Sequence, residues 1–218
     1  MGNYVYSGKR SIDVSVSRDT NSSMYINRNS ILPFIKNNFT AWNYLYSRGV
    51  DPYKLKNVFP IGYDSNSSSA IFYVRDLKGN YVGSKARSVQ GKRFANSTGA
   101  KKSTYLYGAY ELLQSAWQPH DPVWICESEI DALTVWSRGG YAVAIGGSHI
   151  SRIQLNILIQ LGVRRVIDGL DKDEAGREGW KNFCTYVRGI STYNTKYPVN
   201  KKDINDLTDK EFFAIKIY

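Results

Sequence analysis

The order of apolar and polar residues divides the chain into two regions with different patterns. Between residues 61 and 107, short apolar stretches alternate with turns. Residues 70–74 and 81–85 flank a polar turn, which predicts a β-hairpin. Between residues 121 and 207, apolar runs alternate with segments of helical periodicity. That alternation is typical of a parallel sheet covered by helices.

The second region allows specific elements to be predicted. Strands are expected at residues 123–126, 142–145 and 163–167, and helices at residues 128–136, 153–160 and 175–187. Asp168 and Gly169 are expected to form a turn after the last strand. Upstream, Ser30 and Thr40 are expected to be the N-caps of two helices, the second of which ends at Gly49.

The predicted fold class is α/β: a parallel-sheet, Rossmann-like domain preceded by a smaller mixed α/β basic subdomain. The expected boundaries are an N-terminal arm at 1–29, the basic subdomain at 30–118, the α/β domain at 119–208 and a C-terminal tail at 209–218. A chain of 218 residues is long enough to bury a substantial core.

The chain is strongly basic, which favours an anionic partner. Its 29 Lys and Arg residues against 19 Asp and Glu residues give a formal net charge of +10. Nucleic acid is the first candidate and an anionic membrane surface the second. No membrane partner is expected, because no apolar run approaches the ~20 residues of a spanning helix. Residues 1–10 lack the apolar stretch of a signal peptide, so a cytoplasmic protein is expected.

Three acidic clusters follow one another along the second region. They contain Glu127 and Asp131, then Asp171 and Asp173, then Asp203. The first two clusters each follow a predicted parallel strand, and the carboxyl ends of such strands open onto one crevice. Any one of these acids alone is best explained as a solvated loop residue. Together they favour a hard cation, because crowded carboxylates repel one another and Mg²⁺ prefers oxygen ligands.

The acidic clusters resemble the Toprim domain shared by bacterial-type primases, topoisomerases and some nucleases. The Glu-x-x-x-Asp pair at 127–131, the Asp-x-Asp-Glu-Ala-Gly-Arg segment at 171–177 and Lys-Asp-x-Asn-Asp at 202–206 match in type and order. One departure is Ser128, where the family usually has glycine. The resemblance implies that the α/β domain is a Toprim domain.

The upstream region resembles the basic subdomain that precedes Toprim in phage primase-helicases and mitochondrial Twinkle-type proteins. The similar segments are residues 44–50, 72–80, 82–87, 92–94, 99–103 and 106–108. The resemblance spans roughly residues 40–207 and implies a DNA primase catalytic core. Such a core joins ribonucleotides on single-stranded DNA by two-metal nucleotidyl transfer. The Asn-, Lys- and Tyr-rich composition suggests a phage or mobile element.

The resemblance also implies a role for each matching residue. Glu127, Asp171 and Asp173 would be catalytic metal ligands with Asp203 in support, and the ion would be Mg²⁺, with Mn²⁺ as the alternative. Nucleoside triphosphate and template would contact six basic residues, Lys85, Arg87, Lys92, Arg93, Lys102 and Lys202. These positions would form the nucleotide grip of a polymerase.

Two features of full-length primases are not expected in this sequence. Two cysteines, Cys126 and Cys184, cannot form a zinc ribbon, and no Gly-x-x-x-x-Gly-Lys-Ser/Thr run is present for a helicase. The chain would then rely on a replicative helicase or a separate template-recognition protein, act alone, or belong to a larger protein.

Two other functions stay open at this point. A Toprim nuclease would use the same carboxylates without a triphosphate grip. A non-catalytic module would bind nucleic acid or a replication partner through the same fold. Neutralising Lys85 and Arg87 should impair a polymerase more than a nuclease, whereas the binding module should tolerate Glu127→Ala.

Overall fold

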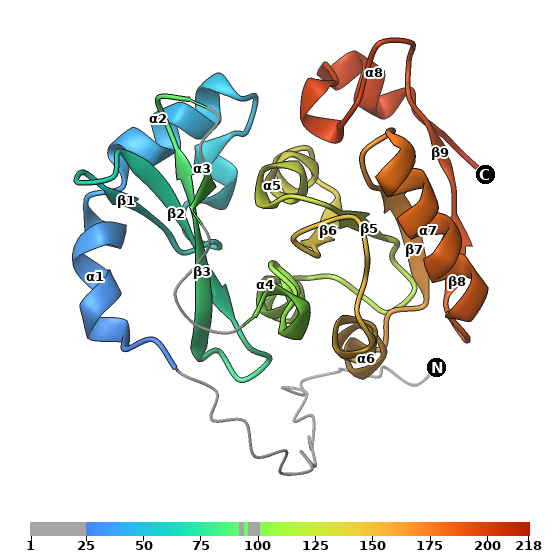
Figure 1. The fold of residues 1–218 in the computed structure, drawn as a ribbon, viewed down its shortest axis with the longest axis horizontal. Coiled ribbons are helices and arrows are strands. Elements are labelled where there is room, and N and C mark those ends of the chain that lie inside the picture. The colour runs from blue at the N-terminus through green and yellow to red at the C-terminus, as the bar shows by residue number, and fades with distance from the viewer. Residues whose placement is uncertain (1–24, 92–93, 96–100) are drawn as a thin grey trace, which may run out of the picture.

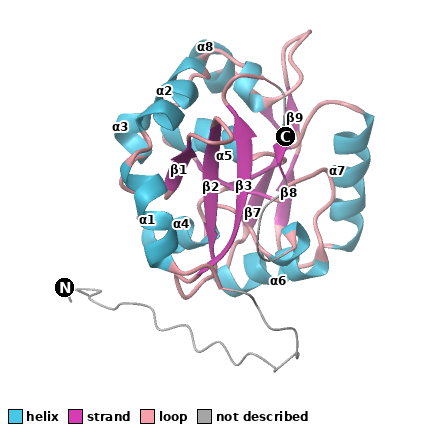
Figure 2. Ribbon diagram, turned by 60° about the vertical axis from the view of Figure 1, so that its left-hand side comes forward, coloured by secondary structure: helices cyan, strands magenta, loops and turns pink. Residues whose placement is uncertain are grey.

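The computed structural model describes residues 25–91, 94–95 and 101–218 of the chain. Lys92, Arg93 and most of the expected N-terminal arm lie outside these residues. The strands occupy the centre of the molecule, with most of the helices around them (Figure 2).

The first part of the chain forms an antiparallel sheet with the strand order β1-β2-β3-β4. Helices lie beside it (Figure 1). The strands are β1 (Ile61–Asp64), β2 (Ser69–Arg75), β3 (Tyr81–Ser88) and β4 (Phe94–Ala95), and the helices are α1 (Arg28–Lys36), α2 (Phe39–Ser47) and α3 (Pro52–Leu55). The predicted hairpin is confirmed, because β2 and β3 pair antiparallel on either side of the 76–80 turn.

The predicted helix caps are wrong by two or three residues. The N-cap of α1 is Asn27, whose side chain accepts a hydrogen bond from the Asn29 backbone N–H. The N-cap of α2 is Asn38, whose side-chain amide instead donates to the Ile61 carbonyl. Asparagine caps a helix as well as serine does, so sequence alone did not separate the candidates. The end of α2 at Gly49 is confirmed, with a positive φ of 78° at that glycine.

The second part of the chain forms a parallel sheet with the strand order β6-β5-β7-β8. Its strands are β5 (Val123–Cys126), β6 (Tyr141–Ala144), β7 (Arg165–Gly169) and β8 (Ser191–Tyr193), and the intervening helices are α5 (Glu129–Ser137), α6 (Arg152–Leu161) and α7 (Glu174–Tyr186). The predicted strand and helix alternation is therefore confirmed. The edge strand β8 was missed because three residues give too short a pattern.

The sequence predicted a turn at Asp168 and Gly169, but these are the last two residues of β7. Asp168 is buried there and forms an ion pair with Lys172. That ion pair lets a carboxylate lie within a buried strand, which explains why the apolar pattern ended too early to mark the strand's true end.

Alternate residues of the parallel sheet contribute to two separate cores. Trp124 and Cys126 of β5 pack with α5, with the antiparallel sheet and with Phe212, in one cluster. Val123 and Ile125 face the other side, where α6, α7 and helix α4 (Ala109–Gln114) pack. The first core crosses the boundary expected at residue 118, so the two parts of the chain share one apolar interior.

Residues 209–218, which were expected to be a tail, form helix α8 (Asp209–Phe213) and strand β10 (Lys216–Ile217). Strand β10 pairs antiparallel with β9 (Thr195–Lys196), and Phe212 stacks at 5.5 Å from Trp124. This segment is therefore part of the fold. Among the described residues, no helix is long and apolar enough to cross a membrane.

Candidate active site

A cavity of about 260 Å³ opens at the carboxyl ends of β5 and β7. Its wall includes four carboxylates and three cationic side chains: Glu127, Asp131, Asp171, Asp203, Arg48, Lys85 and Arg87. The cations come from the C-cap of α2 and from β3 in the first part of the chain, and the acids come from the second part. The cavity therefore lies between the two parts, with charges of opposite sign facing each other.

Glu127 and Asp171 are brought together because β5 and β7 are neighbours in the sheet. The Asp171 backbone N–H donates to Glu127 Oε1 at 3.3 Å. Burial, followed by repulsion from Asp171, raises the pKa of Glu127 to about 7. Burial also raises the pKa of Asp171. Two half-buried carboxylates with raised pKa values are a typical signature of a functional site.

Asp171 and Asp173 both face the ammonium group of Lys202. Lys202 Nζ lies 3.2 Å from Asp171 Oδ2 and 3.3 Å from Asp173 Oδ2. Asp173 is also the N-cap of α7, and a hydrogen bond from the Gly176 backbone N–H lowers its pKa. A cationic group therefore occupies the position between these two carboxylates.

Asp131 lines the cavity as well, although the sequence analysis did not assign it a catalytic or metal role. It is buried, and Ser128, the N-cap of α5, bonds to its carboxylate and to its backbone N–H. Burial, with repulsion from Asp203, raises its pKa to about 7. Its position four residues after Glu127, in the Glu-x-x-x-Asp pair at 127–131, was the available signal.

The fit of a divalent metal can be judged from the donors. Within the part of the chain that the structure describes, no three His, Cys, Asp or Glu side chains are grouped to hold a metal ion. The available donors are carboxylate oxygens, which suit Mg²⁺. Lys202 places a positive charge between Asp171 and Asp173, and Glu127 lies beside Asp171. The residues therefore fit a hard cation by charge and donor type.

The predicted basic residues have different environments. Lys85 Nζ lies 2.8 Å from Glu129 Oε2, and the Glu129 side chain is only 5% exposed. The Lys102 side chain packs over Gly146 and Gly147 at the cavity wall. Arg87 lines the cavity itself. Lys202 contacts the carboxylates of Asp171 and Asp173.

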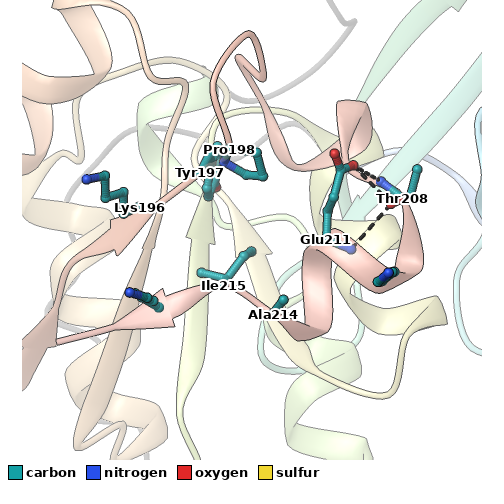
Figure 3. A pocket seen from close by; sticks show the side chains of 9 residues that line it. Lys196, Tyr197, Pro198, Thr208, Glu211, Ala214 and Ile215 are labelled. Atoms are coloured by element: carbon teal, nitrogen blue, oxygen red, sulfur yellow. Dashed lines mark hydrogen bonds between the residues drawn. The ribbon is translucent and has the colours of Figure 1, made fainter.

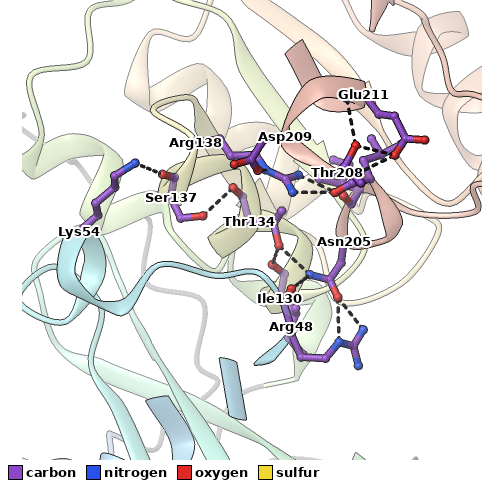
Figure 4. A network of polar contacts seen from close by, with 12 residues as sticks. Arg48, Lys54, Ile130, Thr134, Ser137, Arg138, Asn205, Thr208, Asp209 and Glu211 are labelled. Atoms are coloured by element: carbon purple, nitrogen blue, oxygen red, sulfur yellow. Dashed lines mark hydrogen bonds and ion pairs between the residues drawn. The ribbon is translucent and has the colours of Figure 1, made fainter. Parts of the chain in front are cut away.

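Asn205 connects the two parts of the chain beside this cavity (Figure 4). Its side-chain oxygen accepts from Arg48 Nε at 2.9 Å and Nη2 at 2.6 Å. Its amide donates to the Arg48 carbonyl and, at 3.0 Å, to Thr134 Oγ1, while its backbone N–H donates to Asp131. These contacts make Asn205 a clasp, a polar link between the C-cap of α2 and α5.

Helix α7 begins unusually close to two loops of the site. A Cβ atom on Gly176 would lie 2.1 Å from the Asp171 carbonyl oxygen, and one on Gly179 would lie 1.8 Å from the Ser148 carbonyl oxygen. Only glycine allows such an approach without displacing backbone. The helix therefore fixes the loop that carries Asp171 and Asp173.

The sequence model of a family described as Toprim-like matches residues 124–208. These residues are therefore similar to a Toprim-like domain. The match begins within β5 and contains Glu127, Asp171, Asp173 and Asp203, so the resemblance stated for this part of the sequence is confirmed. No curated protein sequence is significantly similar to the chain.

Solved primase structures share the fold of both parts of the chain. The E. coli primase catalytic core superimposes with a TM-score of 0.67 at 20% identity, over 84% of this chain and 74% of that one. A DnaG primase catalytic domain bound to single-stranded DNA gives 0.67 at 20% identity, with coverages of 84% and 75%. The primase fragment of the bacteriophage T7 primase-helicase gives 0.60 at 23% identity, with coverages of 74% and 66%. The chain thus shares the fold of these primase structures.

Proposed function

We propose that this protein is a DNA primase catalytic core, which joins ribonucleotides into short primers on a single-stranded DNA template. The observation that carries the proposal is the cavity between the two parts of the chain. It combines Toprim carboxylates with the cations of the preceding sheet. A nucleotidyl transferase needs both, because a triphosphate and a template strand must be neutralised together.

In this proposal Glu127, Asp171 and Asp173 hold the divalent cation, Mg²⁺ or Mn²⁺, and Asp203 supports them from η2 (Ile204–Asp206) as its N-cap. When bound, the ion would supply charge neutralisation for the triphosphate and the attacking hydroxyl. Lys85, Arg87 and Lys102 contact triphosphate or template, as would Lys92 and Arg93 outside the described residues. Lys202, which contacts Asp171 and Asp173 in the structure, would be available to a phosphate group if a cation took its place.

The partners proposed for the chain are single-stranded DNA, nucleoside triphosphates and a replicative helicase or separate template-recognition protein. Similar folds occur in a primase described with single-stranded DNA and in the T7 primase-helicase. In one further structure, T7 primase domains bind an RNA/DNA hybrid beside a polymerase. A cytoplasmic location belongs to the same proposal.

Incubation of the protein with single-stranded DNA, labelled ribonucleoside triphosphates and Mg²⁺ or Mn²⁺ tests the proposal. We expect short labelled products that disappear in an Asp171→Asn/Asp173→Asn variant. The matched control is Asp209→Asn, which removes an exposed acid on α8 away from the cavity.

Other products would assign a different activity. Shortened template, lost in the same double variant, would identify a Toprim nuclease. DNA binding without any metal-dependent product, even with a helicase added, would favour the non-catalytic module and contradict the primase proposal.

A further inference from the structure

A second, larger cleft of about 610 Å³ lies at the C-terminal end of the molecule. It separates the β9–β10 ribbon from helix α8, with Tyr197, Pro198 and Ile215 in its wall (Figure 3). None of its lining residues lines the active-site cavity. The cleft is therefore a separate surface feature.

Three lysines line this cleft: Lys196 of β9, Lys216 of β10 and Lys210 of α8. Lys196 and Lys216 are direct cross-strand partners in a ribbon of only two strands. Like charges directly opposite each other destabilise a sheet, and a two-stranded ribbon has little stability to spare. An anion between the two ammonium groups would offset the repulsion between them.

The nearby carboxylates do not supply that anion. Glu211 accepts hydrogen bonds from Thr208 and pairs with Lys201 at 3.3 Å, while Asp209 pairs with Arg138 at 2.9 Å. Across residues 25–91, 94–95 and 101–218, no ion pair of Lys196, Lys210 or Lys216 occurs within 4.0 Å. The positive charge of the cleft is thus not neutralised by these parts of the chain.

Two exposed aromatic side chains lie near these lysines along the chain, although neither lines the cleft. Phe213 is the last residue of α8 and is 69% exposed, and Tyr218 directly follows β10 and is 65% exposed. Phosphate-binding lysines beside exposed aromatic rings are the combination that binds single-stranded nucleic acid, because unpaired bases stack on the rings. An acidic peptide would satisfy the lysines but would leave the rings without a specific role.

The cleft is also connected to the active site along the chain. Lys202 contacts Asp171 in the cavity, and the adjacent Lys201 contacts Glu211, which lines the cleft. We propose that the cleft between the β9–β10 ribbon and α8 binds the phosphate backbone of single-stranded DNA, as a second contact outside the active-site cavity. The choice of DNA rests on the proposed primase function, whereas the cationic surface does not.

Fluorescence anisotropy with labelled oligo-dT measures this contact. The test variant is Lys196→Gln/Lys210→Gln/Lys216→Gln, and the matched control is Lys36→Gln/Lys56→Gln/Lys181→Gln, which changes three exposed lysines elsewhere. Both variants lose the same net charge. The loss of three phosphate contacts should weaken binding by on the order of tenfold at about 50 mM salt. It should also make the slope of log K against log salt concentration shallower by about 2. The control variant should change neither the affinity nor this slope by more than about twofold.

Each remaining outcome has a distinct meaning. Equal effects of the two triple variants would overturn the proposed contact, because net charge alone would then explain them. Unchanged binding in the cleft variant would also overturn it while leaving the primase proposal intact. Failure of the wild-type chain to bind oligo-dT at low salt would contradict both. Stronger binding of an acidic peptide or oligo-U than of oligo-dT would reject DNA as the occupant.

Discussion

At the scale of single residues, the site is dominated by carboxylates held where water does not fully solvate them. Glu127 and Asp131 both have pKa values near 7, and burial is the largest cause in each case. A raised carboxylate pKa means that the folded state binds protons more readily than the unfolded state. The acidic site therefore costs stability at the pH where these groups are ionised.

Asp131 gives the clearest pH prediction, because it is fully buried. Without metal, the free energy of unfolding should fall as pH rises from about 4 through about 7, since the folded state holds its proton over that range. In Asp131→Asn this fall should shrink by on the order of 1–3 kcal/mol. Urea unfolding in EDTA at several pH values measures it. An unchanged slope in the variant would show that Asp131 is not the titrating group.

Lys85 needs a paired substitution, because its partner Glu129 is buried. Lys85→Met alone would leave an uncompensated carboxylate and should destabilise the fold by about 3 kcal/mol. Lys85→Met/Glu129→Gln should recover most of this loss while still weakening nucleotide binding. Thermal melts and nucleoside triphosphate titration separate the two effects. Full nucleotide affinity in the double variant would remove Lys85 from the proposed grip.

At the scale of elements, the clasp made by Asn205 predicts how the two parts of the chain are coupled. Asn205→Ala leaves Arg48 and Thr134 without their partner and should cost about 2 kcal/mol of stability. Asp209→Asn, which weakens a more exposed ion pair on α8, should cost less than about 1 kcal/mol. Equal losses in urea unfolding would argue against a specific clasp.

The start of α7 supplies a second prediction at this scale. Gly176→Ala places a methyl group against the Asp171 carbonyl oxygen and should destabilise the fold by about 2–3 kcal/mol. Gly91→Ala is the matched control, since nothing lies within 4 Å of its added Cβ. Thermal denaturation compares them. If Gly176→Ala is no less stable than Gly91→Ala, the loop that carries Asp171 shifts easily to make room for the methyl group.

The sequence predicted the elements of the parallel sheet better than it predicted the contacts around them. Apolar runs bounded by polar residues identified β5 and α5 almost to the residue, because the pattern is set by burial on both faces of the sheet. Strand β8 and the β9–β10 ribbon are too short for such a pattern. The contacts of Asn205 with Arg48 join positions 157 residues apart, which no local pattern encodes.

At the scale of the whole molecule, the shared apolar core makes the two parts interdependent. Leu45 and Phe72 belong to the same buried cluster as Cys126 and Leu133. Unfolding should therefore be a single transition, with tryptophan fluorescence and far-UV circular dichroism coincident in urea. A chain of residues 119–218 alone should bind a hydrophobic dye and lack a cooperative melt. A cooperative melt of that fragment would show that the Toprim-like domain folds independently.

The bridging position of Lys202 also changes what metal loading means for this protein. An ammonium already neutralises Asp171 and Asp173 in the structure, so under the proposed function a divalent ion would have to exchange with Lys202. The exchange would bring two positive charges and remove one, a net gain of one charge at the carboxylates. The loop that carries both acids is therefore neutralised without a metal, and the displaced Lys202 would lie close to the phosphates of a bound nucleotide.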